Sequence, residues 1–334
     1  MNSKIIFDSY NKKKKIKKIK MGCGSPTVIN SPYNRNSFTL NNVASELIKV
    51  FPLPSSRLLA CSASTYQIIP ITEGECDPET IKFEKEIYTI TITHHKNGLK
   101  LIEGTCDGLI IIEDLESSKM LYLEGHQSTI VTLLMLKNGK LCSCSADGQV
   151  IIWNIYKGRD LFNFYPHEKA IWDIVELFDR RLLSVSDDDT ANIVSYLNGV
   201  KMEVSFEAKK SKCALQLKDG RIVFNSNVNI LIYQIEKLPD LNVPERAKGK
   251  KQFKPDFTIF DAHSSCVSCI LQLNNGDLCS GGEDGVIKIW SLKYEFKNIM
   301  ELSGHRRKIC HIYESNDGML ISCSDDRSIR IWVE

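Results

Sequence analysis

One pattern of eleven residues occurs three times along this chain of 334 residues. It reads SCSADGQVIIW at residues 143–153, SGGEDGVIKIW at residues 280–290 and SCSDDRSIRIW at residues 322–332. In each copy a run of small residues and an alternating apolar run flank a short acidic turn, which is typical of two β-strands joined by a tight connection. One such unit cannot bury its apolar faces alone, so the copies must stack against one another.

The acidic turn residue recurs at regular intervals, at Asp107, Asp147, Asp188, Asp284 and Asp326. The first two intervals are 40 and 41 residues, and the last is 42 residues. The wide third interval holds a further copy at residues 218–233, whose turn has lost the aspartate, and another degenerate copy lies at residues 57–71. Periods near 40 residues indicate a repeat array, and the chain contains seven units.

Each unit predicts four short strands. An apolar run such as residues 130–136 ends at a turn such as Asn138-Gly139, and a Ser/Cys-rich strand, the acidic turn and a third strand follow. A short fourth run, for example residues 120–123, leads into the next unit. The fold class expected from this pattern is all-β, with seven four-stranded antiparallel units.

A histidine marks the same register, because His126, His167, His263 and His305 each lie 21 residues before the acidic turn residue of their unit. In the third and the last unit, a serine two residues before the aspartate and a tryptophan six residues after it complete a set. A buried carboxylate must be hydrogen-bonded, so we expect each set to form a polar chain that ties neighbouring strands together. The two predicted structural tetrads are His126, Ser145, Asp147 and Trp153, and His305, Ser324, Asp326 and Trp332.

These units resemble those of WD-repeat β-propellers, in which Gly-His, an aspartate and Trp-Asp recur at this spacing. The resemblance extends over residues 37–334 and implies a seven-bladed β-propeller built from four-stranded antiparallel blades. Individual units depart from the pattern. Gly-His is kept only at His126 and His305, and none of the three repeat tryptophans is followed by aspartate.

The two ends of the propeller are expected to meet in one blade. The seventh unit stops after its third strand, whereas residues 38–40 match the fourth-strand run at residues 121–123. An N-terminal strand that completes the last blade removes the open sheet edges. A segment rich in proline and lysine, residues 237–257, interrupts unit five between its third and fourth strands, and we predict a surface insertion there.

Charge is distributed unevenly along the chain. The formal net charge is +2, but residues 1–20 carry eight lysines and one acid. Subtracting these from the 43 basic and 41 acidic residues leaves 35 and 40, a net charge of −5 for the rest. We predict a disordered basic arm over residues 1–36, in which the segment from Lys12 to Lys20 makes weak contact with anionic lipid or nucleic acid.

Two observations bear on the cellular location. Many of the twelve cysteines, such as Cys142, Cys279 and Cys323, fall at matching repeat positions, which predicts reduced core residues and a cytoplasmic protein. Met21-Gly22-Cys23 resembles an acylation signal if translation starts at Met21, and the protein would then be peripheral to a membrane. The chain contains no run of 18 apolar residues that would predict a transmembrane helix.

The resemblance implies that partners bind the narrow top face, at the positions three and five residues after the histidine and one residue before the turn acid. Trp172 stands out, because its strand already has Ile171 and Ile174 for the core, and exposed tryptophans are frequent interface anchors. The alternative is a tryptophan packed between blades. The charged positions predict a rim of mixed charge, suited to a peptide with an acidic and an apolar residue. The expected partner-binding residues are Trp172, Tyr88, Lys210, Lys212, Lys308, Asp187, Glu283 and Asp325.

The expected function is that of a non-catalytic scaffold that binds peptide segments or partner domains. The alternative is a substrate-receptor subunit of a larger enzyme complex, such as a ubiquitin ligase. The recurring Ser, His and Asp residues indicate blade architecture rather than a catalytic triad, because an active site need not recur every 40 residues. Cys266 and Cys269 form a CxxC without a second pair at zinc spacing. We expect no cofactor, no metal and no small-molecule substrate.

Overall fold

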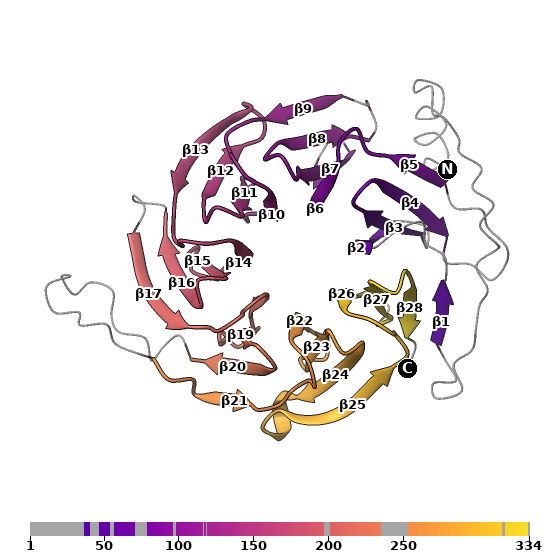
Figure 1. Cartoon of the computed structure of the whole chain (residues 1–334), viewed down its shortest axis with the longest axis vertical. Coiled ribbons are helices and arrows are strands. Elements are labelled where there is room, and N and C mark those ends of the chain that lie inside the picture. Colours follow the sequence, from indigo (N-terminus) through magenta and orange to yellow (C-terminus); the bar gives the residue numbers. More distant parts are fainter. Residues whose placement is uncertain are drawn as a thin grey trace, which may run out of the picture.

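The computed structural model describes residues 37–40, 47–53, 57–70, 79–95, 98–115, 117, 119–196, 201–234, 253–315 and 318–332. Its strands form seven four-stranded antiparallel sheets, arranged as the blades of a ring (Figure 1). The prediction of an all-β, seven-bladed propeller is therefore confirmed. The predicted basic arm, the acylation motif and most of the predicted insertion lie outside the described residues.

Each blade contributes one strand next to the central axis and a second strand paired with it. Counted from blade one to blade seven, the inner strands are β2 (Leu47–Leu53), β6 (Ile87–His95), β10 (Ile130–Met135), β14 (Ile171–Glu176), β18 (Ala214–Gln216), β22 (Val267–Gln272) and β26 (Ile309–Glu314). The second strands are β3 (Arg57–Ser62), β7 (Gly98–Thr105), β11 (Leu141–Ser145), β15 (Leu182–Ser186), β19 (Ile222–Ser226), β23 (Leu278–Gly282) and β27 (Leu320–Ser324).

The third and outer strands complete each sheet. The third strands are β4 (Thr65–Pro70), β8 (Ile110–Asp114), β12 (Val150–Asn154), β16 (Thr190–Ser195), β20 (Asn229–Tyr233), β24 (Val286–Ser291) and β28 (Ile329–Trp332). The outer strands are β5 (Glu79–Lys82), β9 (Met120–Leu123), β13 (Arg159–Phe164), β17 (Lys201–Glu207), β21 (Phe257–Ile259), β25 (Lys297–Ser303) and, in blade seven, β1 (Ser37–Leu40). One short 3₁₀ helix, η3 (Leu292–Tyr294), joins β24 to β25.

The N-terminal strand closes the ring as the sequence predicts. β1 pairs antiparallel with β28, and the register runs from Ser37 opposite Trp332 to Leu40 opposite Ile329. Figure 1 shows the indigo β1 beside the yellow β28, next to the C-terminus. The first and last strands of the described chain thus share one sheet, which leaves β28 without an open edge.

The apolar core is divided among the junctions between blades. Seven clusters of buried side chains each join two neighbouring blades, because the strands are apolar on both faces. The cluster between blades seven and one contains Ile321 and Ile331 together with Leu47 and Leu58. Ring closure therefore rests on packing as well as on the β1–β28 pairing.

A polar contact recurs at four of these junctions. A carboxylate or amide oxygen near the end of one inner strand accepts a hydrogen bond from a backbone N–H in the first turn of the preceding blade. The four contacts are Glu176 with Lys137 (2.6 Å), Gln216 with Phe178 (2.7 Å), Gln272 with Lys218 (2.7 Å) and Glu314 with Asn274 (2.6 Å). We call them the inter-blade latches.

The antiparallel topology sorts the connections onto two faces. The turns between second and third strands lie on the same face as the loops that enter the inner strands, and we call this the top face. The turns between first and second strands, which carry the latches, lie on the opposite, bottom face. β21 begins at Phe257, so the sheet of blade five resumes at the last residue of the predicted insertion.

Candidate interaction site on the top face

In blade seven, four side chains fix the top-face loop. His305 Nδ1 lies 3.1 Å from Asp326 Oδ2, and His305 Nε2 lies 2.8 Å from Ser322 Oγ. Trp332 Nε1 donates to the same serine oxygen at 2.9 Å. Asp326 also accepts a hydrogen bond from the backbone N–H of Arg306 at 2.8 Å. The chain of contacts therefore links the loop, the second strand and the third strand.

The predicted serines, Ser145 and Ser324, were the wrong members of these tetrads. The hydroxyl between histidine and tryptophan belongs to Ser143 and Ser322, four residues before the aspartate instead of two. Ser324 instead donates to the backbone oxygen of Arg307 and accepts from the backbone N–H of Asp326. The error arose because residues two apart in a strand point to the same face, so the spacing alone could not separate them.

A complete tetrad in blade six was missed for the same reason. His263 contacts Asp284 at 3.1 Å and Ser280 at 2.8 Å, and Trp290 donates to Ser280 at 2.9 Å. The position two residues before Asp284 is Gly282, so a pattern that required serine there excluded this blade. A search for serine four residues before the aspartate would have identified the serines of blades three, six and seven.

In blade three, Gln149 instead of the predicted Asp147 contacts the histidine of the tetrad. His126 Nδ1 lies 2.8 Å from Gln149 Oε1, whereas Asp147 accepts from the backbone N–H of Gln149 at 3.0 Å. His126 Nε2 and Trp153 Nε1 both contact Ser143 Oγ, at 2.6 and 2.7 Å. Asp147 therefore shapes the turn but does not contact the histidine, contrary to the prediction.

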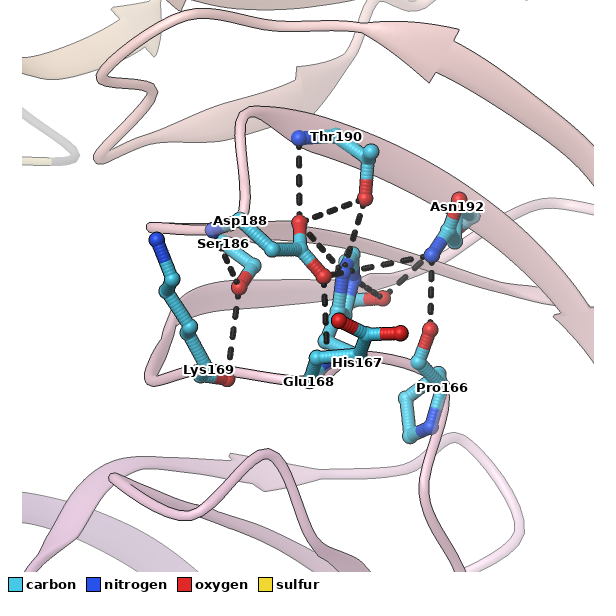
Figure 2. A network of polar contacts seen from close by, with 9 residues as sticks. Pro166, His167, Glu168, Lys169, Ser186, Asp188, Thr190 and Asn192 are labelled. Carbon is cyan, nitrogen blue, oxygen red and sulfur yellow. Dashed lines mark hydrogen bonds and ion pairs between the residues drawn. The ribbon is translucent and has the colours of Figure 1, made fainter.

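Blade four keeps the histidine network although valine replaces its tryptophan. Figure 2 shows His167 surrounded by Asp188, Thr190 and Asn192. His167 Nδ1 lies 3.0 Å from Asp188 Oδ2 and 3.0 Å from Thr190 Oγ1, and Asn192 Nδ2 donates to the backbone oxygen of Pro166 at 2.7 Å. Asp188 also accepts from the backbone N–H of Glu168 at 3.1 Å. The network holds the loop that leads into β14 and Trp172.

A β-bulge at the top of the inner strand re-aims one side chain in six blades. The register shifts by one residue near the start of β2, β6, β10, β14, β22 and β26. The bulged residues are Ile48, Tyr88, Val131, Trp172, Ser268 and Cys310. Bulges of this kind turn a side chain out of the regular alternation next to functional sites. The backbone itself therefore turns the side chains at these six positions away from the regular alternation of the strand.

Trp172, Lys212 and Glu283 form a compact group, although they come from blades four, five and six. Lys212 Nζ pairs with Glu283 Oε1 at 2.8 Å and lies 6.0 Å from the centre of the Trp172 ring. Trp172 is partly exposed, but its Nε1 is buried and has no hydrogen-bond partner among the described residues. A buried donor without an acceptor is unfavourable, so this indole is suited to a ligand that supplies an oxygen.

Tyr88 and Asp187 share the electrostatic surroundings of this group. Tyr88 is 39% exposed, and partial burial raises its pKa, while Lys212 opposes and Asp187 adds to that rise. We call Trp172, Lys212, Glu283, Tyr88 and Asp187 the mouth cluster. It brings together five of the eight residues predicted to bind a partner.

The other three predicted residues lie toward blades five and seven. Asp325 accepts a hydrogen bond from the Cys310 thiol at 2.9 Å, and its own backbone N–H donates to the carbonyl of Lys308 at 3.1 Å. Lys210 adopts a left-handed conformation (φ 51°), and its backbone N–H bonds Asp189. Lys210 and Lys308 both act on the Cys266 thiol, whose pKa is raised mainly by burial. The rim therefore carries mixed charge.

Comparison with known proteins agrees with this geometry. A family model described as "WD domain, G-beta repeat" matches residues 117–154, 254–291 and 296–333. The chain thus contains three WD repeats and has the fold of a seven-bladed β-propeller. In solved structures, the WD40 β-propeller domain of Doa1 matches with a TM-score of 0.71 at 20% identity, over 93% of this chain and 97% of that chain. At that identity the likeness shows the fold alone.

Two relatives illustrate the sequence similarity. Apoptotic protease-activating factor 1 of Homo sapiens is 28% identical over 131 residues, which are 39% of this chain and 10% of that protein. The WD repeat-containing protein 55 homolog of Dictyostelium discoideum is 22% identical over 289 residues, which are 80% of this chain and 66% of that protein. The matches thus span less than two thirds of each relative. WD-repeat propellers are in general scaffolds for protein interaction.

Three ionisable residues of the propeller axis were missed by sequence reasoning. Lys49, Asp173 and His311 each follow a bulged residue directly. Burial lowers the pKa of Lys49, raises that of Asp173 to about 6 and lowers that of His311 to about 3. Asp173 accepts backbone hydrogen bonds from Ala214 and Ile174, at 3.0 and 2.9 Å. A search for charged residues or histidines within the otherwise apolar inner strands would have identified these three residues.

The serine hydroxyls of the propeller's tetrads are structural. Ser143, Ser280 and Ser322 are fully buried, and each accepts a hydrogen bond from a tryptophan, so no substrate can reach them. The two cysteines of the CxxC have different surroundings, because Cys266 lies beside Asn225 and Cys269 lies against Gly281. Within the part of the chain that the structure describes, no group of three or more His, Cys, Asp or Glu side chains is arranged to hold a metal, and no helix could span a membrane.

Proposed function

We propose that this WD-repeat propeller is a non-catalytic interaction platform whose mouth cluster binds an extended segment of a protein partner. The buried, unpaired N–H of Trp172 carries the proposal. Polar atoms inside folded proteins are rarely left unpaired, and this one belongs to a partly exposed tryptophan that lies beside the Lys212–Glu283 ion pair. A bound peptide carbonyl gives the indole its missing acceptor.

The chemistry of the mouth cluster defines the segment that fits. The flat faces of Trp172 and Tyr88 favour an apolar or aromatic side chain, because aromatic side chains are frequent anchors in interfaces. Lys212 is neutralised by Glu283 in the free protein. An acidic residue of the partner replaces Glu283 as the partner of Lys212, and Glu283 then becomes free to accept from the partner's backbone.

Site-specific photo-cross-linking tests where the partner binds. A benzophenone amino acid replaces Tyr88 on the top face or, as a matched control, Tyr156, which is 60% exposed in the turn after β12 on the bottom face. We expect a discrete cross-linked product from the Tyr88 position alone. Products from the Tyr156 position alone would overturn the choice of face.

Two substitutions then separate anchoring from folding. Trp172→Ala should weaken binding of the cross-linked partner at least about tenfold, as expected for an interface anchor. Trp172→Phe keeps an aromatic ring but removes the indole N–H, so its affinity for the partner should lie between those of the wild type and Trp172→Ala. The melting temperature is measured for both variants. A large fall in melting temperature with unchanged affinity would make Trp172 a core residue instead.

Three further predictions concern the N-terminal segment and the location of the protein. The contact of the segment from Lys12 to Lys20 with anionic lipid or nucleic acid concerns residues outside the described part of the chain. The acylation motif at Met21 lies there too. Cytoplasmic location remains our proposal.

A further inference from the structure

Blade seven carries a group of basic side chains on its top face that form no ion pair with a described carboxylate. Arg306, Arg307 and Arg327 are exposed, and Lys308 and Arg330 are half-buried. Together they form what we call the blade-seven basic surface. None of the five takes part in an ion pair among the described residues.

The nearby carboxylates are already engaged. Asp326 accepts from the backbone N–H of Arg306 at 2.8 Å, from the backbone N–H of Ser328 at 3.0 Å and from His305 at 3.1 Å. Asp325 accepts from the Cys310 thiol at 2.9 Å. These contacts hold the carboxylates in place within the turn, so the guanidinium groups remain available to an external anion.

The corresponding position of blade six provides an internal comparison. Lys288 occupies the place of Arg330, four residues after the turn aspartate, and stands opposite Glu301 of the outer strand, with which it pairs at 3.2 Å. Arg330 stands opposite Thr39 of β1, which carries no charge. Because the N-terminal strand replaces the usual outer strand, blade seven has a cation here without the acid that blade six supplies.

Arg330 is held in a defined position. Its guanidinium lies 5.8 Å from the centre of the Trp332 ring. It also lies against Gly304, where an added Cβ would come within 2.5 Å of Nη1. Its Nε is buried and has no hydrogen-bond partner among the described residues. A guanidinium fixed in this way loses little side-chain entropy when it binds an oxyanion, and one of its donors is unmet in the free protein.

Arg327 occupies a turn position that favours glycine. Its φ is 65°, in the left-handed region, and the matching residues of blades three and six are Gly148 and Gly285, with φ of 82° and 77°. A side chain at such a φ is strained relative to glycine. The arginine therefore adds charge at a position where the backbone gains nothing from it, which points to a role in binding.

We propose that the blade-seven basic surface binds a phosphorylated side chain of a protein partner, separately from the mouth cluster. A phosphate group offers close to two negative charges and three acceptor oxygens, and guanidinium groups bind such oxyanions through paired hydrogen bonds. A nucleic-acid strand fits less well, because a polyanion needs a basic track several phosphates long. All five basic residues belong to one blade, and Asp325, whose backbone N–H bonds the Lys308 carbonyl, lies among them.

Fluorescence anisotropy with the full chain tests this proposal. The probes are two labelled degenerate peptide libraries that differ only in a central phosphoserine or serine. We expect the phosphorylated library to bind at least about tenfold more tightly, the lower end for hydrogen bonds to charged groups. Arg330→Met, which keeps the side-chain length over Trp332, should abolish that difference. Lys288→Met, the matched change in blade six, should leave it intact.

Further variants keep the outcome decisive. Arg306→Gln with Arg307→Gln changes only exposed side chains and carries the test if Arg330→Met fails to fold. Trp172→Ala should retain the preference for phosphate, which separates this proposal from the one for the mouth cluster. Equal affinity for both libraries, or equal losses in the Arg330 and Lys288 variants, would overturn the proposal. Tighter binding of a single-stranded RNA dodecamer through the same arginines would assign the surface to nucleic acid instead.

Discussion

Two serines of blade three, both fully buried, have different hydrogen-bond roles. Ser143 Oγ contacts His126 at 2.6 Å and accepts from Trp153 at 2.7 Å, whereas Ser145 Oγ accepts only a long contact of 3.5 Å from the backbone of Asp147. Loss of the first hydroxyl leaves a buried indole N–H without an acceptor, and loss of the second leaves no strong donor unpaired. The stability effects of the two serines should therefore differ.

Ser143→Ala is expected to lower the free energy of unfolding by about 2 kcal/mol, the cost of orphaning a buried donor. Ser145→Ala, the matched control, should cost less than about 1 kcal/mol because its bond is long. Denaturant unfolding of the three proteins provides the measurement. A larger loss from Ser145→Ala would restore the serine that we predicted from the sequence.

At the scale of the element, the inter-blade latches link four inner strands, β14, β18, β22 and β26, to the first turn of the preceding blade. Gln272 uses both ends of its amide, accepting from Lys218 N and donating to Gly276 O at 2.8 Å. Each carboxylate oxygen of Glu176 accepts one hydrogen bond, the first from the backbone N–H of Lys137 and the second from the Arg180 guanidinium at 3.1 Å. The two latches therefore need different side-chain chemistry.

Reciprocal substitutions should distinguish these two latches. Glu176→Gln keeps an oxygen for Lys137 and should cost less than about 1 kcal/mol, but Gln272→Glu turns a carboxylate oxygen toward the Gly276 carbonyl and should cost about 2 kcal/mol. Alanine at either position serves as the reference for complete loss. Thermal unfolding of the four variants gives the comparison. Equal effects of both reciprocal changes would show that the latches do not depend on donor and acceptor direction.

At the scale of the whole molecule, the ring is closed by β1 on β28 and by the core between blades seven and one. Removal of residues 1–40 exposes the edge of β28 and should lower stability by about 2–4 kcal/mol, since four paired positions are lost. An open edge also promotes association between chains. Calorimetry and light scattering measure both effects. Removal of residues 1–36 is the control, and an equal loss there would contradict a special role for β1.

Acid should destabilise the whole ring. Burial lowers the pKa of His126, His167, His263 and His305, so the folded state binds fewer protons than the unfolded state below the ordinary histidine value of about 6.5. Stability then rises with pH through this window and is lost as the pH falls from about 7 to 5. Urea midpoints at several pH values test this expectation. A midpoint that stays constant over this interval would contradict it.

The sequence alone was enough to predict the blades, because a strand that is buried on both faces is apolar wherever it recurs. The seven units and the closing strand at residues 38–40 follow from the match between repeats, whereas the candidate top-face positions, Trp172 among them, came from the resemblance to WD-repeat propellers. Periodicity also placed the four histidines. It could not choose between Ser143 and Ser145, because side chains two apart in a strand share a face.

Only the tertiary structure decided which side chains of different blades meet. Trp172, Lys212 and Glu283 come from three units, and nothing local to any one of them encodes the 2.8 Å ion pair or the unpaired indole N–H. The same holds for Arg330, which has no acid opposite it on the outer strand because β1, from the other end of the chain, occupies that position. Spacing along the chain specifies the strands, whereas contacts between blades depend on how the ring closes.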